Sequence, residues 1–233
     1  MARICSVIPA YNEQLHLGVI IKGVKKHGLD VIVVDDGSTD QTATIAAQEA
    51  DFFIRHPENK GKGCALRSGF AFAFEKGYQA IITIDGDGQH NPADIPLFVK
   101  RAESSHAGIV IGNRMHCPKG MPPVRVLCNM VGTKMISVVC KQHIPDALNG
   151  YRIIKREVLE SVTLETEGFD IDPEILIKAS QVGFTVDSVN IECVYGKEVS
   201  HIRPLFDGYD FFRIVIKSAL NRAPSTHLQK STK

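Results

Sequence analysis

Short, largely apolar runs alternate along this chain with longer stretches in which apolar residues recur every three or four positions. Residues 31–34, Val-Ile-Val-Val, are typical of a strand buried on both faces. The strands predicted in this way are 4–8 (ended by Pro9), 31–34, 52–54, 80–84, 109–111, 151–154 and 185–191. The helical spacing predicts helices over about 13–27, 41–50, 64–75, 124–140, 156–161, 173–182 and 207–221. In the first helix, the residues expected on one face are Leu15, Val19, Ile20 and Val24.

The order of these elements predicts an α/β fold. Strands and helices alternate with short connections, which implies a mostly parallel central sheet covered by helices on both faces. The chain has 233 residues, 44% of them apolar, enough for one sizeable core. We expect a single domain over 1–222 and a disordered polar tail over 223–233.

Composition excludes several classes of protein. The formal net charge is +1, which gives no case for nucleic acid binding. Six scattered cysteines, without a Cys-x-x-Cys pair, predict reduced core residues in a cytoplasmic protein. The N-terminus enters a strand at once, so no signal peptide is expected. The longest apolar stretch, 124–140, is interrupted by Arg125, Asn129 and Lys134, which favours a protein at most peripheral to the cytoplasmic face of a membrane.

The segment Asp85-Gly86-Asp87-Gly88-Gln89 carries the clearest chemical signal. It follows the predicted strand 80–84, so its carboxylates fall at the carboxyl end of a buried strand, where α/β sheets bind ligands. Asp85 and Asp87 alternate along the chain and can face one point. With the amide of Gln89 they suit Mg²⁺ or Mn²⁺ shared with substrate phosphates. The alternative is a polar turn, since Asp and Gly are common turn residues.

Other predicted strands end in polar loops at the same edge of the sheet. Asp35 and Asp36 can accept hydrogen bonds from a nucleoside, and Tyr11 can stack on a base; a turn role is the alternative for each. The glycine loop 59–63 places Lys60, Lys62 and Arg67 near a helix N-terminus, where they either meet an anion or form a solvated basic face.

Two arginines later in the chain are candidates for diphosphate contact. Arg114 follows the predicted strand 109–111, and Arg152 belongs to Asn149-Gly150-Tyr151-Arg152. A guanidinium group can donate two parallel hydrogen bonds to phosphate oxygens.

Taken in order, these motifs resemble family 2 glycosyltransferases, and within them the dolichyl- or polyprenyl-phosphate sugar synthases. The similarity covers most of the chain. The segments that carry it are Val7–Glu13, Val33–Asp40, Asn59–Gly63, Asp85–His90, Gly112–Arg114, Asp146–Arg152, and Glu174 followed by Gly183.

The resemblance implies a GT-A type nucleotide-diphospho-sugar transferase fold and an inverting, metal-dependent transfer of a hexose to a polyprenyl phosphate. It implies that Asp85, Asp87 and Gln89 surround the metal and that Arg114 and Arg152 lie near phosphates. It also implies a set of residues around the nucleoside of a UDP- or GDP-hexose: Pro9, Tyr11, Glu13, Asp36 and the adjacent Asp35.

The chain departs from the family near the acceptor-phosphate element. The synthases end with Arg-x-x-Gly-x-Ser-Lys, whereas here residues 195–201 read Tyr-Gly-Lys-Glu-Val-Ser-His. His201 replaces the lysine, and Arg203 is a candidate substitute for the arginine. The predicted helix 207–221 has a wide apolar surface and a basic side, which suits a membrane interface as well as a helix packed on the sheet.

The acceptor decides whether a general base is needed. A lipid phosphate is already ionised, but a sugar hydroxyl in polysaccharide assembly requires a base, for which Asp172 and Glu174 are the candidates. Their alternative role is helix N-terminal charge. A sugar nucleotidyltransferase is less consistent, because its glycine-rich basic loop is missing after the first strand. A non-enzymatic nucleotide-binding module would not require the two carboxylates and Gln89 together.

Overall fold

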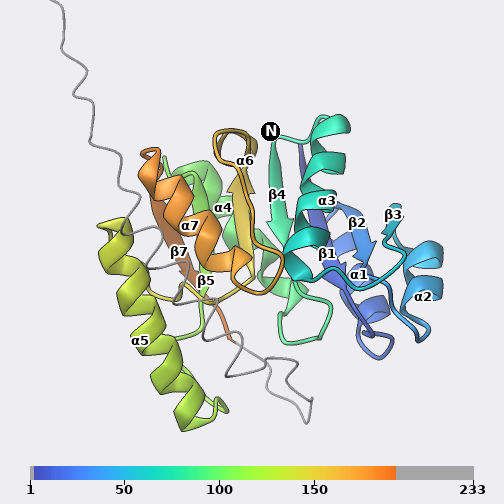
Figure 1. The fold of residues 1–233 in the computed structure, drawn as a ribbon, viewed down its shortest axis with the longest axis horizontal. Helices are drawn as coiled ribbons and strands as arrows, with labels where there is room; N and C mark the ends of the chain where they lie inside the picture. Colours follow the sequence, from blue (N-terminus) through green and yellow to red (C-terminus); the bar gives the residue numbers. More distant parts are fainter. Residues whose placement is uncertain (1–2, 193–233) are drawn as a thin grey trace, which may run out of the picture.

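The computed structural model describes residues 3–192, which form a seven-stranded sheet with helices around it (Figure 1). The strands are β1 (Ile4–Ala10), β2 (Asp30–Asp35), β3 (Phe52–Arg55), β4 (Ala80–Thr83), β5 (Ile109–Asn113), β6 (Arg152–Lys155) and β7 (Val186–Asn190). The helices are α1 (Leu17–Lys25), α2 (Thr42–Glu49), α3 (Lys62–Glu75), η1 (Pro92–Asp94), α4 (Ile95–Ser104), α5 (Pro123–Cys140), α6 (Arg156–Glu160) and α7 (Ile171–Gln181). The helix predicted over 207–221 and the tail 223–233 lie outside the described residues.

The strand order is β3-β2-β1-β4-β6-β5-β7, and the predicted mostly parallel sheet is confirmed. Only β6 is antiparallel to its neighbours, β4 and β5, among the described strands. Because β2 and β3 follow β1 on one side and β4 returns to its other side, the order in which strands are added to the sheet reverses between the parallel strands β1 and β4. Open α/β sheets bind ligands at the carboxyl ends of strands at such a point.

Helices cover both faces of the sheet, as expected. On one face, α3, α5, α6 and α7 bury side chains such as Phe70, Ile136 and Ile175 against the sheet. On the other, α1, α2 and α4 do so with side chains such as Ile21 and Phe98. The strands supply both cores because alternate residues point to opposite faces.

Strand β1 runs two residues further than predicted, through Pro9. Proline lacks an amide hydrogen and disrupts central strands. Here β1 pairs with β4 only from Ile4 to Val7, while its pairing with β2 continues to Ala10. Pro9 therefore lies where the strand has a partner on one side, and the missing donor costs little.

Two helices of the structure differ from the sequence prediction. Helix α1 begins at Leu17, and its buried residues are Leu17, Ile20, Ile21 and Val24, whereas Leu15 and Val19 are exposed. Helix α4 is missing from the sequence prediction. Ile95 and Phe98 bury at helical spacing after Asn91-Pro92, and the Asn91 side chain accepts a hydrogen bond from Ala93 N–H. That capping pattern was a usable signal.

Candidate active site

The two carboxylates predicted from the sequence are half-buried in the loop after β4. This loop lies at the carboxyl ends of β1 and β4, between which the strand order reverses. This loop meets the loop after β1: a Cβ added at Gly86 would lie 3.4 Å from Glu13 Cγ and 3.5 Å from the Pro9 carbonyl oxygen. The predicted meeting of these two polar loops is therefore confirmed.

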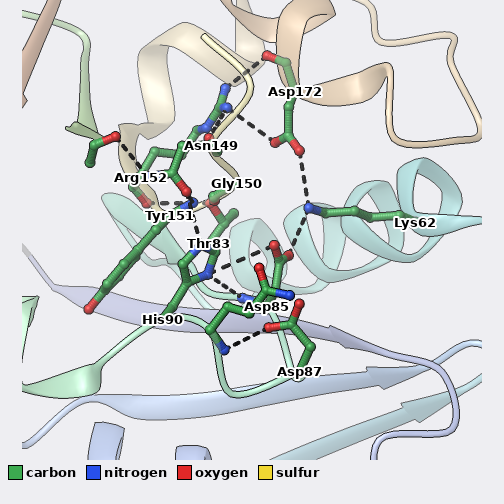
Figure 2. Close-up of polar contacts among 12 residues, drawn as sticks. Lys62, Thr83, Asp85, Asp87, His90, Asn149, Gly150, Tyr151, Arg152 and Asp172 are labelled. Carbon is green, nitrogen blue, oxygen red and sulfur yellow. Dashed lines mark hydrogen bonds and ion pairs between the residues drawn. The ribbon is translucent and has the colours of Figure 1, made fainter. Parts of the chain in front are cut away.

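Lys62, the first residue of α3, reaches into the centre of this site (Figure 2). Its Nζ lies 2.7 Å from Asp85 Oδ1 and 3.0 Å from Asp172 Oδ2. Its side chain is only 10% exposed, so the ammonium group joins the loop after β4 to the first turn of α7. Of the two interpretations for Lys62, a solvated basic face is excluded. Its partners are carboxylates, and its role toward a nucleotide stays a prediction.

The charges in this centre support one another. Burial raises the pKa of the Asp85 carboxyl, but the neighbouring ammonium group of Lys62 outweighs burial, and this pKa is lowered to about 2. Burial likewise lowers the pKa of Lys62, whereas Asp172 and Asp85 raise it by more. Gly150 leaves the necessary room, since a Cβ there would be 2.7 Å from Lys62 Nζ and 2.9 Å from Asp85 Oδ2. Asp85 and Lys62 are therefore both charged at neutral pH.

His90 holds the carboxylate loop in place through a hydrogen bond. It was not predicted as a site residue. Its Nδ1 accepts the Asp85 backbone N–H at 3.2 Å, and its Nε2 lies 2.9 Å from Asn149 Oδ1. This pattern requires the neutral imidazole with its proton on Nε2. Burial lowers the pKa of His90 against the opposing effect of Asp85, in agreement with that form. The 3.8 Å separation between Nδ1 and Asp85 Oδ2 is too long for a hydrogen bond.

Arg152 and Arg114 are buried and paired with carboxylates, and their expected contact with phosphates stays a prediction. Arg152 is fully buried; it donates to the Asp172 carbonyl oxygen at 2.8 Å and pairs with Asp172 Oδ1 at 3.3 Å. Arg114 donates from Nε and Nη2 to the two oxygens of buried Asp146, at 2.8 and 3.0 Å. In this structure both guanidinium groups stabilise the loops around the site. The sequence alone concealed this because their acidic partners lie 20 and 32 residues away.

The expected nucleoside residues gather beside this centre with uneven exposure. Asp36 accepts hydrogen bonds from the backbone N–H groups of Lys60 and Gly61, and His56 Nδ1 lies 2.6 Å from its Oδ1. Asp36 thus fixes the glycine loop. Asp35 is fully buried and pairs with Arg55 Nε at 3.1 Å. Tyr11 is 38% exposed and available for stacking.

The segment 163–170 forms hydrogen bonds both to the Glu174 side chain and to the N-terminus of α3. The Glu174 carboxylate accepts hydrogen bonds from the backbone N–H groups of Glu165 and Thr166 at 2.9 and 3.0 Å, and Lys178 Nζ lies 2.7 Å away. Gly63 N–H at the start of α3 donates to the Glu167 carbonyl oxygen at 2.7 Å. Glu174 therefore anchors a loop, and the predicted anion site at this helix end is covered by backbone.

The residues present fit a divalent cation. Asp85 and Asp87 are half-buried and one residue apart, and Asp85 is held ionised. Asp87 Oδ1 accepts the backbone N–H of Gln89 at 2.9 Å, which orders the loop. Within residues 3–192, no cluster of three or more His, Cys, Asp or Glu side chains is placed to hold a metal by protein ligands alone. This donor set is typical of a cation that completes its coordination with substrate phosphates.

Comparison with known proteins identifies the class. The family model described as Glycosyl transferase family 2 matches residues 5–163. The chain therefore belongs to this family and is a glycosyltransferase. The predicted GT-A fold is confirmed, and the nucleotidyltransferase and non-enzymatic alternatives are set aside.

Particular relatives refine this picture. An undecaprenyl-phosphate mannosyltransferase of Micrococcus luteus is 29% identical over 208 residues, covering 82% of this chain and 84% of the relative. A UDP-N-acetylglucosamine–dolichyl-phosphate N-acetylglucosaminyltransferase of Methanococcus voltae is 27% identical over 212 residues, covering 81% and 84%. The crystal structure of glucosyl-3-phosphoglycerate synthase from Mycobacterium tuberculosis with Mn²⁺ and UDP has a TM-score of 0.73 at 22% identity, covering 95% of this chain and 80% of that one. The last similarity concerns the fold alone.

Proposed function

We propose that this glycosyltransferase moves a hexose, with inversion, from a nucleotide-diphosphate sugar to a polyprenyl phosphate, with Mg²⁺ or Mn²⁺ as cofactor. The observation that carries the proposal is the pair Asp85 and Asp87 at the carboxyl ends of β1 and β4, with Lys62 in contact with Asp85. The relatives named for undecaprenyl and dolichyl phosphates support this acceptor class.

The two candidate bases also favour a phosphate acceptor over a sugar hydroxyl. A general base needs a carboxylate oxygen within reach of the proton that it removes. The Asp172 carboxylate is paired with Lys62 and Arg152, and that of Glu174 with Lys178 and backbone amides. A lipid phosphate needs no base because it is already ionised. Transfer to a hydroxyl in polysaccharide assembly stays the alternative.

In the proposed reaction, an oxygen of the acceptor phosphate attacks the anomeric carbon while the bond from that carbon to the diphosphate oxygen breaks. The electron pair leaves with the nucleoside diphosphate. Asp85, Asp87 and Gln89 would hold the divalent cation, which neutralises the charge that develops on the diphosphate. Lys62 keeps Asp85 ionised and in place, and Arg152 fixes Asp172, the second partner of Lys62. These contacts preorganise the charges before the substrate binds.

The nucleoside is assigned to the loops after β1 and β2. Tyr11 offers a ring for stacking, while Pro9, Glu13, Asp35 and Asp36 shape the floor, with Asp36 fixing the glycine loop beside it.

The decisive test replaces a carboxylate that has few structural duties. Asp87→Ala should lower turnover by about 10²–10³-fold or more, because the charge on the departing diphosphate is no longer neutralised. The assay measures transfer from UDP- and GDP-hexoses to a short-chain polyprenyl phosphate with Mg²⁺ or Mn²⁺. Glu75→Ala, at the exposed far end of α3, is the control and should leave turnover unchanged. Full activity of Asp87→Ala at saturating metal would overturn the metal assignment.

A further inference from the structure

Helix α5 carries apolar side chains on the side turned away from the domain. We call this set the α5 apolar face; it comprises Val124 (74% exposed), Leu127 (61%), Met130 (57%), Val131 (51%) and Val138 (62%). The opposite side is buried through Asn129, Gly132, Thr133, Ile136 and Cys140. At about 100° per residue, the two sets lie on opposite sides of the helix.

This distribution is unusual for a helix on the surface of a domain in water. Such a helix normally has one apolar stripe toward the core and charged residues opposite it. Lys134 is the one charged residue among the exposed positions of α5. A continuous exposed patch of this kind indicates an interaction surface.

The segment of sequence that contains α5 carries charge of one sign. From residue 104 to residue 145 it contains no Asp or Glu, whereas it contains five basic residues: Arg114, Lys119, Arg125, Lys134 and Lys141. Arg114 is buried and paired with Asp146, so the net positive charge comes from the other four. Lys119, Lys134 and Lys141 are exposed near the start, the middle and the end of the helix. An apolar face with exposed lysines is complementary to an anionic lipid surface, which offers both acyl chains and negative headgroups.

Helix α5 is suited to lie on a bilayer and not to cross it. Its 18 residues and mean hydropathy of 1.3 satisfy the length and composition of a membrane span, and only 22% of it is buried. Its inner side, however, is tied to the domain: Thr133 Oγ1 accepts the Ala147 backbone N–H at 3.0 Å, and Ile136 belongs to the core. Those contacts would be lost if the helix inserted across a membrane.

The position of α5 relates this surface to the active site. Strand β5 is antiparallel to β6, as is β4, so the carboxyl ends of β4 and β5 lie at one edge of the sheet. Asp85 follows β4 at that edge, and the segment from Asn113 to α5 starts there. Figure 1 shows α5 along one side of the sheet and extending past the ends of the strands.

We propose that the α5 apolar face and its flanking lysines form the docking surface of this protein for an anionic phospholipid bilayer. The helix lies in the plane of the interface, with Val124, Leu127 and Val131 among the acyl chains. Docking needs no substrate, so it is independent of the transfer reaction; in combination with it, docking brings the carboxylate edge to acceptors held in the bilayer.

The test measures co-sedimentation of the full chain with vesicles of phosphatidylcholine alone or mixed with phosphatidylglycerol. The wild type should bind the anionic vesicles more strongly, and added salt should weaken binding. Leu127→Glu and, separately, Val131→Glu should each weaken binding by roughly tenfold, because an apolar side chain is replaced by a charge. Leu97→Glu, at an exposed apolar position of α4, is the matched control and should bind as the wild type does.

Four results would overturn the proposal. The first is wild-type binding by both α5 variants. The second is an equal loss in Leu97→Glu. The third is loss of binding through Phe211→Glu or Phe212→Glu, in the predicted C-terminal helix, while both α5 variants bind normally. If light scattering shows a dimer that Leu127→Glu dissociates without loss of vesicle binding, a second copy of the chain is the partner, and the proposal again fails.

A second assay separates this inference from the proposed function. The α5 variants should retain transfer to a short-chain, water-soluble isoprenyl phosphate and lose it with acceptor embedded in anionic vesicles. Vesicle binding through α5 without transfer to any isoprenyl phosphate would refute the proposed function and leave the docking surface intact.

Discussion

Lys62 shows how one side chain can organise a site. Its ammonium group joins two carboxylates that come from the loop after β4 and from α7, Asp85 and Asp172. Without it, two negative charges would face a largely buried space, with Arg152 paired to Asp172 and the more distant Arg114 acting on Asp85. A divalent cation held by Asp85 would supply positive charge to the same region.

Replacement of Lys62 by methionine should therefore have two effects. The free energy of unfolding should fall by about 3 kcal/mol, the typical cost of leaving a buried charge without its partner. Mn²⁺ alone should then raise the melting temperature of Lys62→Met more than that of the wild type, because the cation replaces the missing charge. Thermal unfolding with and without Mn²⁺ measures both effects.

Lys62→Arg, which keeps the charge, is the control and should lose less stability. Unfolding of Lys62→Met at the wild-type temperature would show that the two ion pairs contribute nothing to the fold.

At the scale of elements, the segment 163–170 forms hydrogen bonds to both α3 and α7 and so holds the two helices together. Its backbone is held at one end by the Glu174 carboxylate of α7 and accepts the Gly63 N–H of α3 near the other. This arrangement brings the start of α7, and with it Asp172, to Lys62. The position of a charged residue in the site thus depends on a carboxylate with no direct part in it.

The pH dependence of stability should report on this anchor. Burial raises the pKa of Glu174, but hydrogen bonds from Lys178, Thr166 and the backbone outweigh burial and hold the pKa below its usual range. The ionised carboxylate therefore stabilises the folded chain above the ordinary glutamate pKa of about 4.3, and this contribution is lost as the pH falls through the lower folded pKa. Glu174→Gln should lose about 2 kcal/mol at pH 7 and progressively less in acid.

Urea unfolding of both proteins across this pH range measures the difference. The exposed Glu75→Gln is the control, for which no pH-dependent difference is expected. A constant deficit of Glu174→Gln at every pH would indicate a packing effect in place of the charge.

At the scale of the whole molecule, the topology gathers the loops after β1, β2 and β4 at one edge. The expected nucleoside residues and the two carboxylates therefore lie side by side, which predicts coupled binding of donor and cation. A nucleotide-diphosphate sugar should share its phosphates with the cation held by Asp85 and Asp87.

A thermal-shift panel of UDP- and GDP-hexoses should show this coupling. One base should raise the melting temperature, and only when Mn²⁺ or Mg²⁺ is present, because ligand at 100 times its Kd stabilises a protein by about 2.7 kcal/mol. Asp87→Ala should abolish the metal-dependent part. Equal shifts with and without metal would contradict a shared site.

The sequence by itself determined the elements and the edge at which the chemistry lies. Apolar runs gave the seven strands, and the position of Asp85 and Asp87 after one of them located the site, because these patterns depend on neighbours in the chain. Helix α4 was missed, although its local spacing was available in residues 95–102.

Only the tertiary structure decided what each charged residue contacts. The Lys62 and Asp172 side chains meet across 110 residues, Arg114 and Asp146 across 32, and no local pattern encodes such pairs. The same reason applies to α5. Its sequence shows an apolar helix interrupted by polar residues, but packing alone decides that Asn129 and Thr133 face inward while Val124, Leu127 and Val131 are left exposed.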